Sequence, residues 1–237
     1  MNQTTHGTQL QDLLGLAWRP VAIAFRPTAP PDLAHIESPA PAGCGYWRLA
    51  AEGRIFYTEA QDHYTCPVGA HTHGVDLPEP VAKELQGLVQ TMIGLQYIRP
   101  EEIPALPRRQ GGFGVALYAP LDSAPFVPDV VLVRGTVKQL MLLAEAAQAV
   151  GVTGGGATMG RPTCTVLPEA IQSGRTATSF GCIGNRVYTA LGDEEGYYAL
   201  PGATVPDVVS KLGTIIAANR ALEQFHRARV ASGSSPV

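Results

Sequence analysis

The sequence Val130-Val-Leu-Val-Arg-Gly-Thr136 runs directly into Val137-Lys-Gln-Leu-Met-Leu-Leu-Ala-Glu-Ala-Ala-Gln-Ala-Val150 and then Gly151. Four consecutive apolar residues at 130–133 predict a strand that is buried on both faces of a sheet. From Thr136 the period changes, and the apolar residues recur at three- and four-residue steps, which predicts a helix to Val150. Gly151 is typical of a helix end. The chain therefore contains a sheet with a helix packed on it.

The same alternation of short apolar runs and helical patterns extends to both sides of this unit. Strands are expected at residues 21–25, 54–58, 115–118, 164–167, 176–180, 186–191 and 197–200. Helices are expected at 1–17, 78–93 and 204–227, with a helical turn at 47–52. Too many strands follow one another for a doubly wound sheet. We expect a single α+β domain over residues 1–230, a mixed sheet flanked by helices, with a loose tail at 231–237.

Composition excludes several classes of partner. The 237 residues carry a formal charge of −3, which gives no basic surface for nucleic acid. No run of about 18 apolar residues is present, so we expect no membrane span. The N-terminus lacks the order of a secretory signal, so a cytoplasmic location is expected. Homo-oligomer formation is left open.

One loop concentrates the side chains that bind metals or transfer protons. Residues 62–74, Asp-His-Tyr-Thr-Cys-Pro-Val-Gly-Ala-His-Thr-His-Gly, contain three of the six histidines and one of the four cysteines. Thiol and imidazole groups are metal ligands, and turn-rich loops are where such sites usually lie. The segment is the first candidate for a functional site.

Three of the four cysteines have glycine close by. Cys44 precedes Gly45, Cys66 precedes Gly69 by three residues, and Cys182 precedes Gly184 by two. Glycine lets backbone N–H groups approach a sulfur closely, so Gly45, Gly69 and Gly184 are expected beside a cofactor. We expect the three sulfur atoms to lie within about 7 Å of one another, as shared ligation requires.

Cys164, in Arg161-Pro-Thr-Cys-Thr-Val166, lacks glycine neighbours. It is expected to be a buried core residue in an ordinary strand. Replacing Cys164 with alanine should then leave a bound cofactor in place.

The histidines extend the candidate ligand set. His73, next to Gly74, is expected nearer to Cys66 than His71 is, because residues two apart in an extended segment point to opposite sides. His63 is also a candidate ligand, and Asp62 could orient a neighbouring imidazole. Cysteine and histidine together suit an iron–sulfur cluster with one non-cysteine or open position, a zinc ion, or an axial ligand of haem. Covalent haem is not expected, because CxxCH is absent.

Arg186 follows the third cysteine, in Gly181-Cys-Ile-Gly-Asn-Arg186. A guanidinium group there is suited to hold a carboxylate or phosphate in a forked geometry. On this hypothesis Arg186→Lys weakens ligand binding by about 1–3 kcal/mol and changes stability much less.

The chain resembles the domain of unknown function 169 family over roughly residues 10–218. The resemblance rests on the segment from Leu14 to Phe25, the Thr-Cys-Pro-Val-Gly-Ala motif around Cys66, the strand at Val130 with its helix, and the motif Ser179-Phe-Gly-Cys-Ile-Gly-Asn-Arg186. It implies a small cytoplasmic protein of bacteria or archaea, with Cys66 and Cys182, and Cys44 beside them, at the family's marked positions. It implies no particular ligand.

These patterns favour a cofactor-binding protein, first of all an iron–sulfur or haem redox protein working with a small-molecule ligand or redox partner. A non-catalytic carrier of zinc or a tetrapyrrole is the alternative. A third hypothesis is an enzyme in which Cys66 or Cys182 is a nucleophile activated by histidine. Whether the protein is an enzyme is left open.

Overall fold

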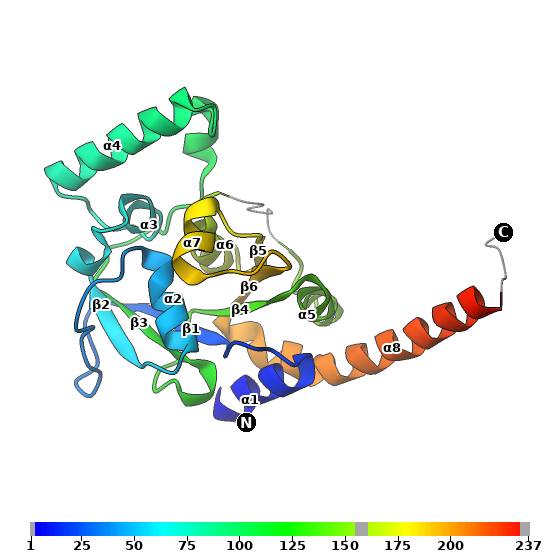
Figure 1. Ribbon diagram of the computed structural model, residues 1–237. Coiled ribbons are helices and arrows are strands. Elements are labelled where there is room, and N and C mark those ends of the chain that lie inside the picture. The colour runs from blue at the N-terminus through cyan, green and yellow to red at the C-terminus, as the bar shows by residue number, and fades with distance from the viewer. Residues whose placement is uncertain (1–2, 155–160, 233–237) are drawn as a thin grey trace.

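The computed structural model describes residues 3–154 and 161–232, which form helices around one six-stranded sheet (Figure 1). The strands are β1 (Val21–Arg26), β2 (Phe56–Glu59), β3 (Val115–Pro120), β4 (Val130–Thr136), β5 (Ala177–Ser179) and β6 (Glu195–Pro201). The α-helices are α1 (Gln3–Leu14), α2 (Gly43–Ala51), α3 (Pro67–Thr72), α4 (Glu79–Gly94), α5 (Val137–Ala149), α6 (Val166–Ser173), α7 (Ile183–Thr189) and α8 (Val205–Ala231). The strand-to-helix unit at residues 130–150 is therefore present as β4 and α5.

The strands lie in the order β2-β3-β1-β4-β6-β5, and every ladder between these neighbours is antiparallel. The predicted α+β class is confirmed, but the ladders of the described sheet are not mixed in direction. The reason is the position of two strands. β1 and β2 run in the same direction, but β3 lies between them and is antiparallel to each. In the same way, β4 and β5 run in the same direction, and β6 lies between them and is antiparallel to each.

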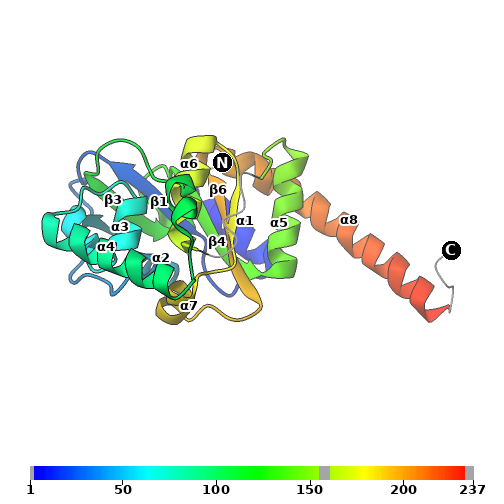
Figure 2. The same ribbon diagram turned by 90° about the horizontal axis from the view of Figure 1, so that it is seen from above.

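Helices cover both faces of the sheet, as the two views show (Figures 1 and 2). Successive side chains of a strand point to opposite faces of the sheet, so one strand contributes residues to two hydrophobic cores. Ile23 and Leu132 pack in the core with α2 and α6. Their neighbours Ala22 and Val131 pack in the other core, with α1, α5 and α8. The helix α4 has no buried residue and stands apart from both layers.

Two predicted strands are wrong. Residues 164–167 lie in a 3₁₀ turn, η4 (Thr163–Thr165), and the start of α6, and residues 186–191 lie in and just after α7. In the second case local contacts override the apolar pattern. The Cys182 sulfur accepts a hydrogen bond from the Asn185 N–H at the start of α7, and Ala190 ends the helix in the left-handed conformation with φ 50°. The predicted turn at 47–52 is the end of the longer helix α2. Of the expected tail, residues 233–237 lie outside the described residues, and α8 continues to Ala231.

Candidate functional site

The cysteines lie at the beginnings of helices on one face of the sheet. Cys44 is the second residue of α2, while Cys66 and Cys182 immediately precede α3 and α7. Cys164 is the middle residue of η4, directly before α6. Helix α2 contacts both α3 and α7, and α3 contacts η4. Segments that are distant in sequence are thus in contact, and each of them carries or directly follows one of the four cysteines.

Close contacts connect these segments. A Cβ atom on Gly69 would lie 3.1 Å from the Cys66 sulfur and 4.0 Å from the Cα of Gly43, so α3 approaches the start of α2 with little room for a side chain. The Cys182 N–H donates a hydrogen bond of 2.6 Å to the Thr163 hydroxyl, next to Cys164. Cys44 and Cys164 are buried, and Cys66 and Cys182 are half-buried, so the group extends from the core to the surface.

The thiols affect one another electrostatically. Burial raises the pKa of Cys44 to about 12, the Asn185 side chain acts to lower it, and charge on Cys66 or Cys182 would raise it further. Burial also raises the pKa of Cys164 well above its ordinary value, and charge on any of the other three cysteines adds to this. Buried thiols with raised pKa values are poor nucleophiles, which disfavours that role for Cys44 and Cys164. A bound metal would reverse the balance, because it deprotonates its thiol ligands.

Asn185 is a residue of this site that the sequence did not single out. It is only 2% exposed, and among the described residues its amide nitrogen and oxygen make no hydrogen bond of normal geometry, although the side chain lies close enough to the Tyr197 hydroxyl to act on its pKa. The side chain lies near enough to Cys44 to act on its pKa. A buried amide whose polar contacts are this weak is costly, and such groups often mark a place where something else binds. The sequence feature that could have identified Asn185 is its position three residues after Cys182, in the first turn of α7.

The two candidate histidines lie together in the interior. His63 and His73 are fully buried, with ring centroids 5.8 Å apart. His63 Nε2 is 2.8 Å from the Thr58 hydroxyl, but His63 Nδ1 and both ring nitrogens of His73 have no hydrogen-bond partner among the described residues. Burial, with a smaller effect from His73, lowers the pKa of His63 to about 3. Burial, with a smaller effect from Arg109, lowers that of His73 to about 4.

The surroundings of these imidazoles are aromatic. His63 packs on Phe113 and Tyr46, and His73 packs on Phe25. His71 is exposed, but residues 67–72 form the helix α3, so the extended loop from which we expected the two histidines to point to opposite sides is wrong. Asp62 does not orient His63, because its carboxylate lies 2.7 Å from His35 Nε2. The role of His63 and His73 as ligands stays a prediction.

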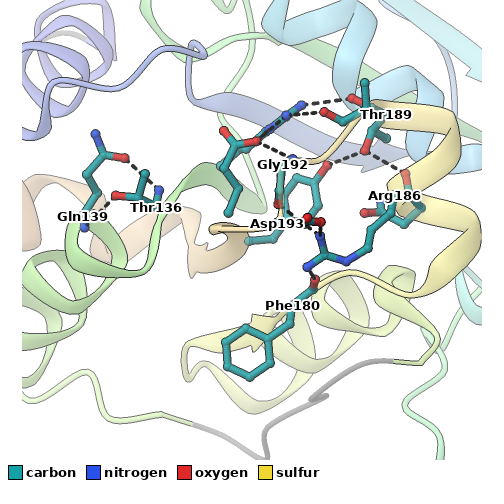
Figure 3. Close-up of polar contacts among 12 residues, drawn as sticks. Thr136, Gln139, Phe180, Arg186, Thr189, Gly192 and Asp193 are labelled. Carbon is teal, nitrogen blue, oxygen red and sulfur yellow. Dashed lines mark hydrogen bonds and ion pairs between the residues drawn. The ribbon is translucent and has the colours of Figure 1, made fainter.

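Arg186 is engaged by the chain itself (Figure 3). Its guanidinium donates hydrogen bonds to the carbonyls of Phe180, at 2.7 Å, and Gly192, at 3.0 Å, and lies 3.6 Å from the Asp193 carboxylate. These contacts join the segments before and after α7. The arginine is therefore a tie within the fold, and the forked donor geometry expected for a ligand is used on backbone carbonyls.

The three candidate glycines differ in their surroundings. Gly69 lies against Cys66, as described above. A Cβ on Gly45 would lie 3.0 Å from that of Ala40, so this glycine permits close packing of α2. A Cβ on Gly184 would lie 3.8 Å from the Tyr188 ring, which is an ordinary contact distance. A cofactor contact for Gly45 and Gly184 stays a prediction.

Within residues 3–154 and 161–232, no group of three histidine, cysteine, aspartate or glutamate side chains is close enough together to hold a single metal ion. The described helices also include none that is long and apolar enough to cross a bilayer.

Comparison with known proteins places this arrangement in a family. The DUF169 family, described as "Uncharacterised ArCR", matches residues 9–211. The chain belongs to the DUF169 family. The uncharacterized protein MJ0308 of Methanocaldococcus jannaschii is 26% identical over 164 residues, which cover 64% of this chain and 67% of that protein. No solved structure matches the chain. The matched range includes all four cysteines of this DUF169 chain.

Proposed function

We propose that this DUF169 protein binds an iron–sulfur cluster through Cys44, Cys66 and Cys182 and acts as a redox protein. The observation that supports the proposal is the contact between the segments that carry these cysteines: α2, which contains Cys44, contacts both α3 and α7, which follow Cys66 and Cys182. Thiolates are the usual ligands of iron–sulfur clusters, and nearby N–H groups tune their reduction potential.

We propose a cluster and not a single ion because the ligands of one ion must lie very close together. The sulfur ligands of one zinc ion each lie about 2.3 Å from it, which brings them within about 4 Å of one another. The described residues contain no such compact group, yet charge on one cysteine acts on the pKa of others. A cluster of several metal atoms holds its cysteines farther apart than one ion does.

The half-buried positions of Cys66 and Cys182 give such a cofactor a short route to the surface. A redox partner that docks at the surface beside Cys66 and Cys182 would be near enough to the cofactor to exchange electrons with it. The buried thiols would meanwhile keep the cofactor away from solvent, which tunes the reduction potential.

The test is anaerobic reconstitution of the purified protein with ferrous iron and sulfide. We expect iron and acid-labile sulfide in the folded protein, with a broad visible absorption band, and loss of both in Cys66→Ser. Ala170→Ser is the matched control, because it places a hydroxyl in the same buried layer without removing a thiol. A wild-type protein that holds no iron and sulfide contradicts the proposal. A sharp Soret band would instead indicate haem, and a colourless protein that retains zinc would indicate a carrier.

A further inference from the structure

The sheet consists of two halves with the same topology. From the centre outward, one half reads β1-β3-β2 and the other reads β4-β6-β5. In each half the first two strands in sequence run in the same direction, and the third strand lies between them. In each half the third strand ends in proline, Pro120 or Pro201, followed by a 3₁₀ turn.

The register shows that these halves are equivalent residue by residue. Val21 pairs with Pro120 in one half, and Val130 pairs with Pro201 in the other, so Val21 corresponds to Val130. Ile23, two residues on, then corresponds to Leu132. Where the halves meet, Val21 pairs with Leu132 and Ile23 pairs with Val130. Exchange of the halves turns each of these pairs into the other, which is the property of a two-fold axis.

Hydrogen bonds beyond the ladders follow the same relation. The Leu121 N–H donates to the Pro20 carbonyl at 2.8 Å, and the Gly202 N–H donates to the Asp129 carbonyl at 2.8 Å. Each donor is the residue after the proline of the third strand, and each acceptor is the residue before the first strand. The equivalence thus includes the chain just outside the sheet.

The cysteines obey this symmetry, two in each half. Cys44 lies at the start of α2, between β1 and β2, and Cys164 lies in η4, directly before α6, between β4 and β5. Cys66 follows β2 and immediately precedes α3, and Cys182 follows β5 and immediately precedes α7. Cys164 is therefore the counterpart of Cys44, although its sequence neighbours differ.

Contacts between the halves bring the two pairs together. Helix α2, with Cys44, contacts α7, which follows Cys182. Helix α3, which follows Cys66, contacts η4, with Cys164. The segment with Cys44 therefore contacts the helix after Cys182, and the segment with Cys164 contacts the helix after Cys66. Both contacts join one half of the sheet to the other.

We propose that Cys164 is the fourth thiolate of the site, so that each half contributes two ligands to one iron–sulfur cluster. This inference rests on the proposed function and makes it more specific. Four thiolates complete the ligand set of a four-iron cluster, with no iron left open to a substrate. It reverses the expectation from sequence that Cys164 lies outside the site.

The experiment compares the iron and sulfide content per folded chain of Cys66→Ser and Cys164→Ser after anaerobic reconstitution, with Ala170→Ser as the control. We expect Cys164→Ser to lose the cluster to the same extent as Cys66→Ser, while the control keeps it. Wild-type content and spectrum in Cys164→Ser, together with loss in Cys66→Ser, would overturn this inference and leave the proposed function standing. No iron and sulfide in the wild type would overturn both.

A second measurement covers the case in which Cys164→Ser does not fold. Mössbauer spectroscopy of the reconstituted wild type reports whether its iron sites have the same kind of ligand. Four thiolate-bound sites are expected. One site that differs from the other three would contradict a fourth cysteine ligand.

Discussion

The hydrogen bonds of the Arg186 side chain are made to backbone carbonyls of the protein itself. Its guanidinium joins the carbonyls of Phe180 and Gly192 across the two ends of α7. We expect Arg186→Lys to lower the free energy of unfolding by about 1–3 kcal/mol, because lysine cannot bond both carbonyls and hydrogen bonds to charged groups are of this size. Urea unfolding measures the loss.

Cluster content after reconstitution should stay unchanged in Arg186→Lys. This outcome replaces the hypothesis from sequence, which expected weaker ligand binding and little change in stability. Lower cluster content with unchanged unfolding would restore the earlier hypothesis.

His71 and His73 lie two residues apart at the end of α3 but differ in burial. His73 is fully buried with both ring nitrogens unpartnered, whereas His71 is exposed. If either histidine supports the cofactor, His73→Ala should lose more iron per folded chain than His71→Ala after reconstitution. His71→Ala is the matched control for the loss of an imidazole from the same segment. Greater loss in His71→Ala would contradict the prediction.

At the scale of elements, α8 shows how burial is distributed along one helix. Its first half contributes Val205, Val208 and Leu212 to the core, and its second half projects from the body (Figure 2). Leu212 is fully buried, whereas Leu222 is 58% exposed.

We therefore expect Leu212→Ala to lower the free energy of unfolding by about 2–5 kcal/mol, because it leaves a cavity in the core. Leu222→Ala makes the same chemical change at an exposed position and should alter stability by no more than about 0.5 kcal/mol. Chemical denaturation of both variants checks the difference. Equal losses would mean that the outer half of α8 is buried in solution, for example against a second copy of the chain.

At the scale of the whole molecule, one half-buried ion pair, between Arg134 and Glu195, contributes to acid stability. Arg134 on β4 binds Glu195 on β6, donates to the carbonyls of Thr189 and Ala190, and lies over the Trp18 ring. Burial by itself raises the pKa of Glu195, but hydrogen bonds from Arg134 and Gly192 and nearby positive charge outweigh it, so the pKa is lowered.

A lowered carboxyl pKa gives stability above the unfolded value, about 4.3, and this stability is lost as the pH falls toward the folded value. Glu195→Gln should lower the free energy of unfolding at pH 7 by on the order of 3 kcal/mol and flatten its fall below about pH 4.5. Unfolding curves from pH 3 to 7 measure both effects. Glu223→Gln is the control, because Glu223 pairs with Arg227 at the surface and should contribute little. A Glu195→Gln curve parallel to that of the wild type would contradict the prediction.

Most elements could be predicted because their signals are local. The apolar run at Val130 and the helical period after it predicted β4 and α5, and the end of α5 at Ala149 agrees with the stop at Gly151. Short segments were less predictable. Val187 and Leu191 lie in an alternating apolar pattern, but the Cys182 cap and the left-handed Ala190 form a short helix there, with Val187 71% exposed.

The candidate site could be predicted in part, for a related reason. Glycine neighbours identified Cys44, Cys66 and Cys182, because close backbone approach leaves a trace in sequence. Cys164 has Thr163 beside it instead, and the Thr163 hydroxyl takes the Cys182 N–H. Asn185 was missed because an asparagine in a sequence does not show whether its amide will be buried or exposed in the fold.

The sequence by itself determined the α+β class and the positions of the long helices and central strands, and it singled out three cysteines as a candidate site. Periodicity and glycine spacing are properties of neighbouring residues, so these features follow from short stretches of chain. Only the tertiary structure decided that β3 and β6 insert between parallel-running strands, that Arg186 is tied to the backbone, and that Cys164 matches Cys44 across a two-fold relation. Each of these depends on which distant segments pair. Pairing is set by burial of whole faces of the sheet, which no local pattern specifies.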